Sequence, residues 1–214
     1  MKFKTISLPY ERPLGGPADE DNSDQYTAAI PRNVISLHSS ENDLIFDPFI
    51  GFGTTAIIAE ELNRIPYGIE ADRIRFEWAA GQVQHWNHIV HDDALNLKNY
   101  NFPKMDLCVT SPPFMPMDDD WNPLYSGDPN YAEYSQYLGK LESILIKTKE
   151  IMKPGAPLFI HTDDIETSVI TPLINDMHNI TSKHFDFVEM IKIEFSGEET
   201  PDDYQSTHLL HFRA

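Results

Sequence analysis

The sequence has 214 residues, of which 41% are hydrophobic, and its 34 acidic and 16 basic side chains give a formal net charge of −18. This length suits one domain with one sizeable core, and no uncharged apolar run approaches the roughly 18–20 residues of a membrane span. Residues 1–110 carry a net charge of −7 and residues 111–214 carry −11. Because Lys and Arg supply most of the affinity for a phosphate backbone, the charge argues against tight nucleic-acid binding by this chain alone.

The N-terminal segment predicts an arm and not a leader. No apolar stretch of signal-peptide length follows Met1, so we expect a cytoplasmic protein. Residues 11–25 are polar, acidic and rich in Gly and Pro, and we expect a mobile arm over residues 1–25 and a single domain over residues 26–214. The domain is expected to open with a helix over Pro31–Ser39. The single cysteine, Cys108, excludes an internal disulfide and is expected to be buried.

A strand, a glycine turn and a helix come next. Leu44–Asp47 reads as a short buried strand, residues 48–55 contain Gly51 and Gly53, and residues 56–62 have the apolar face of a helix. Glycines there allow a ligand to approach the backbone closely. The second strand ends in Glu70, about twenty positions past the glycines, where an acid can hold the hydroxyls of a ribose. The alternatives are a plain tight turn and a solvated acid.

The pattern of strands and helices continues. Residues 72–84 predict a helix, and residues 88–91 predict a third strand that is followed by Asp93, a carboxylate able to accept from an adenine amino group. Further helices are expected over residues 131–152 and 166–177, and further strands over residues 158–161, 185–195 and 208–212. This alternation predicts an α/β fold with a mostly parallel sheet and an antiparallel C-terminal hairpin.

The fourth strand, Leu107–Val109, ends at a rigid polar corner formed by residues 110–114, Thr-Ser-Pro-Pro-Phe. The prolines cannot donate to a sheet ladder, so the strand must stop there. Ligands bind at the carboxyl edge of such sheets. The Ser111 hydroxyl, the carbonyls of Ser111 and Pro112 and the ring of Phe114 suit a planar substrate with an exocyclic amine. The alternative is an ordinary strand-ending turn.

Two metal hypotheses are weak. His85, His88 and His91 straddle a helix end and a strand, so their spacing does not keep them on one face. The run Asp118–Asp120 is better explained as a solvated acidic loop. We therefore predict no metal site.

The motifs Asp47-Pro-Phe-x-Gly-x-Gly-Thr-Thr55 and Thr110-Ser-Pro-Pro-Phe114 resemble those of the S-adenosylmethionine-dependent amino-methyltransferases of DNA. The resemblance covers roughly residues 26–161 and implies a Rossmann-like class I methyltransferase fold with a seven-stranded sheet. It implies S-adenosyl-L-methionine as cofactor. The cofactor residues that it implies are Asp47, Phe49, Gly51, Gly53, Thr54, Glu70, Ala71, Asp93 and Thr110, and those for the target base are Ser111, Pro112, Pro113 and Phe114.

The resemblance ranks the candidate functions. The Ser-Pro-Pro-aromatic form is closest to the cytosine-N4 branch, so methylation of DNA cytosine N4 is expected first, with adenine N6 second and an RNA base third. The cofactor motif precedes the Pro-Pro motif, whereas many cytosine-N4 enzymes have the reverse order, and Ile50 and Phe52 are bulky for the turn. The alternative from another class is a non-catalytic subunit that binds a basic partner. An active subunit that borrows target recognition from a second protein reconciles the motifs with the charge.

Overall fold

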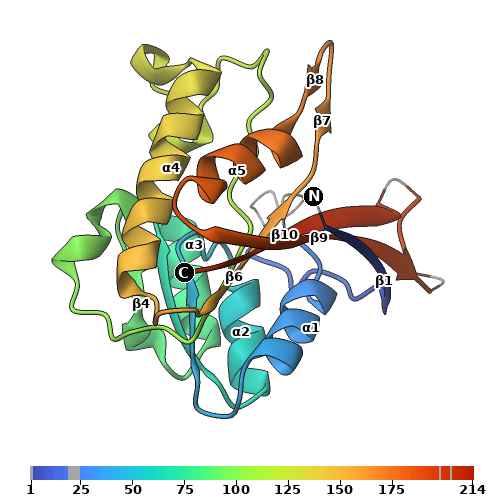
Figure 1. Ribbon diagram of the computed structural model, residues 1–214. Coiled ribbons are helices and arrows are strands. Elements are labelled where there is room, and N and C mark those ends of the chain that lie inside the picture. Colours follow the sequence, from blue (N-terminus) through green and yellow to red (C-terminus); the bar gives the residue numbers. More distant parts are fainter. Residues whose placement is uncertain (1, 19–24, 198, 203) are drawn as a thin grey trace.

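The computed structural model describes residues 2–18, 25–197, 199–202 and 204–214. The main sheet has the order β1-β9-β10-β6-β5-β2-β3-β4 (Figure 1). Its strands are β1 (Phe3–Pro9), β2 (Leu44–Asp47), β3 (Ile65–Glu70), β4 (Ile89–His91), β5 (Leu107–Thr110), β6 (Pro157–Thr162), β9 (Asp186–Ser196) and β10 (Ser206–Arg213). The helices are α1 (Ala29–His38), α2 (Thr54–Glu61), α3 (Arg73–Gln82), α4 (Tyr134–Ile151) and α5 (Leu173–Ser182). Short 3-10 helices are η1 (Trp86–His88), η2 (Ala94–Asn99), η3 (Pro123–Tyr125) and η4 (Pro129–Tyr131).

The predicted fold class is confirmed. Strands β3, β5 and β6 extend the sheet from β2 through parallel pairings, and β10 is antiparallel to both β6 and β9. The sheet has eight strands instead of the seven that the resemblance implied, because Phe3–Pro9 pairs in parallel with Met190–Ser196. These residues lie within the predicted mobile arm, where the structure instead has a strand. Residues 19–24 of that arm lie outside the described residues.

Helices cover both faces of the sheet (Figure 1). On one face, α1 and α2 pack over Ile45, Leu107 and Val109. On the other face, α4 and α5 pack over Phe46 and Cys108. Neighbouring residues of β2 and β5 thus point to opposite faces, so these strands are buried on both sides and read as continuous apolar runs. Cys108 is fully buried, as predicted.

The segment expected to be a helix over residues 166–177 is different. A two-stranded ribbon of β7 (Ile165–Glu166) and β8 (Ile170–Thr171) comes first, and α5 begins only at Leu173, after Pro172. Leu173, Met177 and Ile180 are four and three residues apart and supply the buried stripe of α5. The hydroxyls of Thr167 and Ser168 bond Asp118, so a contact distant in sequence orders the ribbon. None of the helices described is long and apolar enough to cross a membrane.

Candidate cofactor and base site

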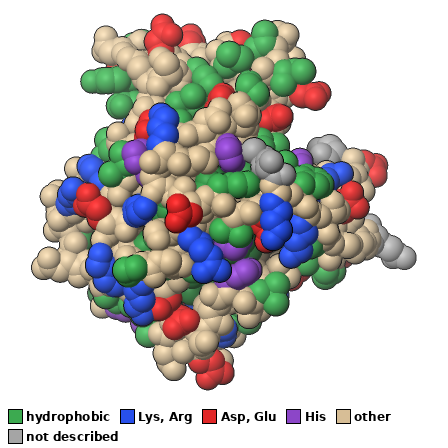
Figure 2. Space-filling view, in the orientation of Figure 1, with side chains coloured by type: hydrophobic (Ala, Val, Ile, Leu, Met, Phe, Trp, Pro, Cys, Tyr) green, Lys and Arg blue, Asp and Glu red, His purple; other side chains and the backbone are tan. Residues whose placement is uncertain are grey.

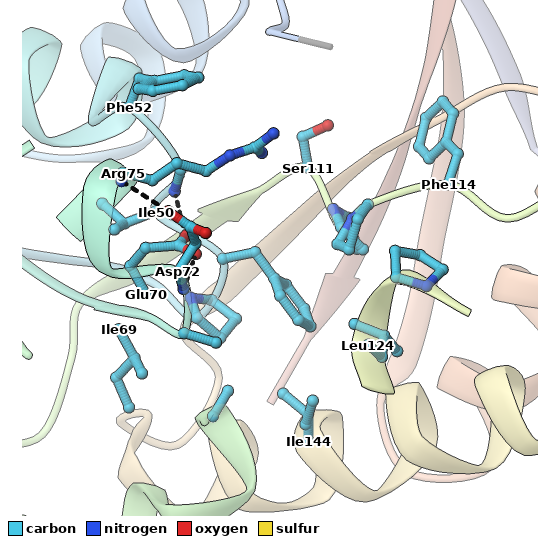
Figure 3. A pocket seen from close by; sticks show the side chains of 18 of the residues that line it. Ile50, Phe52, Ile69, Glu70, Asp72, Arg75, Ser111, Phe114, Leu124 and Ile144 are labelled. Carbon is cyan, nitrogen blue, oxygen red and sulfur yellow. Dashed lines mark hydrogen bonds between the residues drawn. The ribbon is translucent and has the colours of Figure 1, made fainter. Parts of the chain in front are cut away.

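A cavity of about 860 Å³ lies at the carboxyl ends of β2, β3, β4, β5 and β6. This edge is where parallel α/β sheets bind ligands. The order of the strands reverses at β2, because β3 and β4 lie on one side of it and β5 and β6 on the other. The predicted site residues that line it are Phe49, Gly51, Thr54, Glu70, Ala71, Asp93, Ser111, Pro112, Pro113 and Phe114. Asp47, Gly53 and Thr110 are not part of this lining. Figure 3 shows Glu70 on one side of the cavity and Ser111 and Phe114 on the other.

The glycine turn and Glu70 hold one another in place. Gly51 has a φ of +54° and its N–H donates to Glu70 Oε2 at 2.8 Å, while Glu70 Oε1 accepts from the Asp72 N–H at 2.8 Å (Figure 3). Burial raises the pKa of Glu70. Both carboxylate oxygens retain lone pairs beyond these bonds, so Glu70 can accept from two vicinal hydroxyls in the cavity.

Gly53 does not line the cavity, and its role is to let two helices pack closely. It has a φ of +93°, and a Cβ atom there would lie 3.1 Å from Ala79 Cβ. The glycine therefore permits close contact between the start of α2 and α3, with no side chain between them.

Asp47 lies behind the cavity wall at the point where β2 and β5 diverge. Its Oδ1 accepts from Thr110 Oγ1 at 2.6 Å and from the Phe49 N–H at 2.9 Å, and its Oδ2 accepts from Thr55 Oγ1 at 2.6 Å. Only 1% of Asp47 is exposed, and burial raises its pKa to about 6. Asp47 and Thr110 thus join the glycine turn to the Ser-Pro-Pro-Phe corner without facing the cavity.

The corner itself is fixed from two directions. The Tyr137 hydroxyl of α4 donates to the Pro113 carbonyl at 2.9 Å, and Ser111 Oγ lies 2.8 Å from His161 Nδ1. The Phe114 ring stacks on the His161 imidazole with 5.7 Å between ring centroids. Ser111 and Phe114 therefore share one supporting residue, on β6.

His161, Tyr26 and Tyr204 line the cavity and were not predicted as site residues. Burial lowers the pKa of His161 to about 4, so the ring is neutral. The Tyr26 ring also stacks on this imidazole, with 5.5 Å between ring centroids. One signal for His161 was available, because it is a polar residue near the carboxyl end of an apolar strand, at the same sheet edge as Ser111.

Asp93 lines the cavity, and two protein donors hold its carboxylate in place. Its Oδ1 accepts from the Leu95 N–H at 2.9 Å and its Oδ2 from Lys140 Nζ at 2.6 Å. Lys140 is buried and also lies 4.2 Å from the centre of the Tyr125 ring. Lys140 thus does not lie on a solvated face of α4, because its ammonium group bridges η2 and η3.

The loop after the corner carries three aromatic residues, Trp121, Tyr125 and Tyr131. Tyr125 and Tyr131 stack on each other, with centroids 4.2 Å apart and planes within 4°, and neither lines the cavity. Trp121 does line it and is 59% exposed. Gly127 lies directly against the Trp121 ring. Of these three aromatic residues, only Trp121 lines the cavity.

The three spaced histidines have separate partners. His85 Nδ1 lies 2.6 Å from Glu60 Oε1, His88 stacks on Tyr67, and His91 Nε2 lies 3.2 Å from the Ala71 carbonyl. Within the described residues, no three His, Cys, Asp or Glu side chains group in a way that would hold a metal ion.

Comparison with known sequences finds similarity over part of the chain. Residues 13–80 match the family model for DNA methylase. The chain is 41% identical over 49 residues to the type II methyltransferase M.BglII of Bacillus subtilis. These 49 residues are 23% of this chain and 14% of that protein. It is 32% identical over 85 residues to the orphan methyltransferase M.BamHII of Bacillus amyloliquefaciens. This match covers 38% of this chain and 31% of that protein. The matched segments thus span less than a third of these relatives' lengths.

Comparison with solved structures extends the likeness to the whole fold. A methyltransferase from Pyrococcus furiosus has a TM-score of 0.57 at 15% identity and covers 94% of this chain and 89% of its own. A precorrin 8W decarboxylase from Methanobacterium thermoautotrophicum has a TM-score of 0.59 at 16% identity, covering 95% and 98%. Residues 13–80 are therefore similar to the DNA methylase family, and the chain is built on the Rossmann-like methyltransferase fold.

Proposed function

We propose that this protein transfers a methyl group from S-adenosyl-L-methionine to the exocyclic amine of a nucleic-acid base, with DNA cytosine N4 as the first candidate. One observation carries the proposal. The glycine turn at Gly51, together with Glu70, lines the same cavity as the Ser-Pro-Pro-Phe corner, which begins 41 residues after Glu70. A glycine turn with an acid serves a nucleoside cofactor, and an acceptor beside a ring serves a planar amine.

The residues present fit the cofactor. A cavity of about 860 Å³ has the size of small-molecule sites, and it combines a carboxylate, Glu70, with the apolar side chains of Ile50 and Ile69. Glu70 would hold the ribose hydroxyls, Ala71 and Ile69 would flank the adenine, and Asp93 would accept from its amino group. When bound, S-adenosylmethionine supplies an electrophilic methyl group.

The chain's own residues would orient the nucleophile. Ser111 Oγ and the carbonyls of Ser111 and Pro112 are acceptors for the two amine hydrogens, and Phe114 offers a ring against the base. Accepting from the amine stabilises the positive charge that its nitrogen acquires as the C–N bond forms. Holding the amine in line with the methyl group removes an entropic cost that free reactants would bear. A base taken from a duplex must be flipped out, and stacking would offset part of that cost.

The proposal is tested by offering the purified chain labelled S-adenosylmethionine together with DNA, RNA or cell protein in parallel. Mass analysis of the recovered nucleosides is expected to show N4-methylcytosine in DNA. N6-methyladenine would keep the reaction class and change the base. Label in protein alone, or in none of the three, would refute the proposal.

Cofactor affinity is expected to depend on Glu70. Glu70→Ala removes the acceptors for the ribose and releases the N–H groups of Gly51 and Asp72, so S-adenosylmethionine and its demethylated product should bind about 5- to 150-fold more weakly, about 1–3 kcal/mol. Titration calorimetry measures this directly. The matched control is Glu77→Ala on α3, whose carboxylate pairs only with exposed Arg73 within the described structure, and it should bind as wild type.

Duplex DNA is expected to bind weakly to this chain alone, with a Kd above about 1 μM at physiological salt. On the face shown in Figure 2, basic side chains lie interspersed with acidic ones. The ammonium groups of Lys140, Lys147, Lys149 and Lys153 each contact a protein oxygen. We infer that activity in dilute solution needs low salt or a more basic partner protein. Sub-micromolar, strongly salt-dependent binding, measured by fluorescence anisotropy, would contradict this.

A further inference from the structure

A chain of hydrogen bonds leads from Ser111 away from the cavity. Ser111 Oγ lies 2.8 Å from His161 Nδ1, and His161 Nε2 lies 2.7 Å from Thr207 Oγ1. The Thr207 hydroxyl donates to Asp163 Oδ2. His161 and Thr207 are buried, whereas 27% of the Asp163 side chain is exposed. The chain therefore connects the cavity wall to a carboxylate that reaches solvent.

The donor and the acceptor of each hydrogen bond in this chain can be assigned by starting from Asp163. An ionised carboxylate only accepts, so the single hydroxyl hydrogen of Thr207 is committed to Asp163. Thr207 Oγ1 must then accept from His161 Nε2–H. A neutral imidazole carries one hydrogen, so Nδ1 accepts, and the Ser111 hydroxyl donates to it.

This polarity determines what Ser111 offers to a ligand. With its one hydrogen directed at His161, Ser111 Oγ has only lone pairs left for a group in the cavity. It is an acceptor for an amine N–H and cannot donate at the same time. A hydroxyl free to rotate would spend part of its time as a competing donor.

We propose that Asp163, Thr207 and His161 form a positioning relay that holds Ser111 as an acceptor and carries away the proton displaced from the methylated amine. This rests on the proposed function. The nitrogen lone pair forms the new C–N bond, the S–CH₃ bond breaks with its electrons left on sulfur, and the amine nitrogen has one proton too many.

The relay moves that proton in four hops. The amine proton passes to Ser111 Oγ while the serine proton passes to His161 Nδ1. The Nε2 proton then passes to Thr207 Oγ1, and the threonine proton to Asp163. The net result is one proton on Asp163, which water can remove because this side chain is partly exposed.

Other titratable groups face the relay. His208 Nδ1 lies 2.8 Å from Asp163 Oδ1, and the Tyr204 hydroxyl lies 3.4 Å from His161 Nε2. His208 anchors the carboxylate, and the Tyr204 hydroxyl makes a long second contact with His161 and also faces the Thr207 hydroxyl. Substituting His161 itself would also disturb the rings of Tyr26 and Phe114 that stack on it, so the informative position is Thr207.

The test compares two substitutions at Thr207, which distinguish a role of the side chain's shape from a role of its hydroxyl group. Thr207→Val keeps the shape and removes the hydroxyl, and Thr207→Ser removes a methyl group and keeps the hydroxyl. Thr162→Val is the matched control, because Thr162 is an equally buried neighbour of His161 whose hydroxyl has no hydrogen-bond partner among the described residues. Initial rates are measured with tritiated S-adenosylmethionine and unmethylated plasmid DNA, and S-adenosylhomocysteine affinity is measured by calorimetry.

The expected result is at least about a tenfold lower rate for Thr207→Val, with near wild-type rates for Thr207→Ser and Thr162→Val and equal affinity for S-adenosylhomocysteine in all four proteins. A packing role for Thr207 would reverse the order of its two variants. If wild-type protein transfers methyl groups and Thr207→Val matches Thr162→Val, the relay is wrong and the proposed function stands.

A second readout does not depend on activity. Nitrogen-15 NMR of histidine-labelled protein, with His161 assigned by comparison with His161→Asn, is expected to show the Nε2–H tautomer in wild type and a loss of that preference in Thr207→Val. An Nδ1–H tautomer in wild type would overturn the relay. If wild-type protein methylates nothing, the proposed function fails, and this spectrum still decides the polarity.

Discussion

Asp47→Ala is expected to lower the free energy of unfolding by about 3–5 kcal/mol, because three donors, two of them buried, lose their acceptor at once. These donors are the hydroxyls of Thr55 and Thr110 and the Phe49 N–H. Urea denaturation followed by circular dichroism measures the loss. Asp43→Ala is the control, since Asp43 directly precedes β2 and its side chain accepts one exposed bond from the Ser40 N–H, and this substitution should cost about 1 kcal/mol.

The same carboxylate should make stability depend on pH. Its pKa is about 6 in the folded protein against an ordinary value of 3.8, so the folded state binds the proton more tightly. Protonated Asp47 therefore adds up to about 3 kcal/mol to the free energy of unfolding. This contribution is complete below about pH 4 and is lost as the pH rises through 6. Asp47→Asn removes the titration. The difference between its unfolding free energy and that of wild type should therefore change between pH 4 and 6, and a constant difference would contradict the prediction.

Ser111→Ala is expected to lower the rate of methyl transfer by about 10²–10³-fold while cofactor affinity stays near wild type. The substitution removes the acceptor that stabilises the amine as it gains charge, and it does not touch Glu70 or the glycine turn. Phe114→Ala removes the ring against which the base would stack, worth about 1–3 kcal/mol, and should weaken transfer in the same selective way.

The control for these variants is Ser143→Ala, an exposed serine of α4 that bonds only Gly139 within the described structure. Single-turnover rates and S-adenosylhomocysteine calorimetry on the same preparations separate chemistry from cofactor binding. If Ser111→Ala transferred methyl groups as fast as Ser143→Ala, the corner would be a strand-ending turn and no more.

Local signals in the sequence were sufficient for the order of the main elements. Proline stops a strand and glycine permits a left-handed turn wherever they occur, so the ends of β2 and β5 were readable before any contact was known. Once these strands are parallel, their carboxyl ends must meet at one edge. The sequence therefore also determined that the Gly51 turn, Glu70 and the Ser111 corner face the same side of the sheet.

Contacts between distant residues decided the rest. β1 forms because β9, some 190 residues later, offers it an edge, and α5 starts late because the ribbon before it bonds Asp118. Whether Asp47 faces the cavity or supports it depends on Thr110, 63 residues away. The direction of the Ser111 hydroxyl depends on Asp163 through two intermediate side chains from different strands. Hydrogen-bond polarity belongs to the assembled network and not to any one residue, which is why only the tertiary structure revealed it.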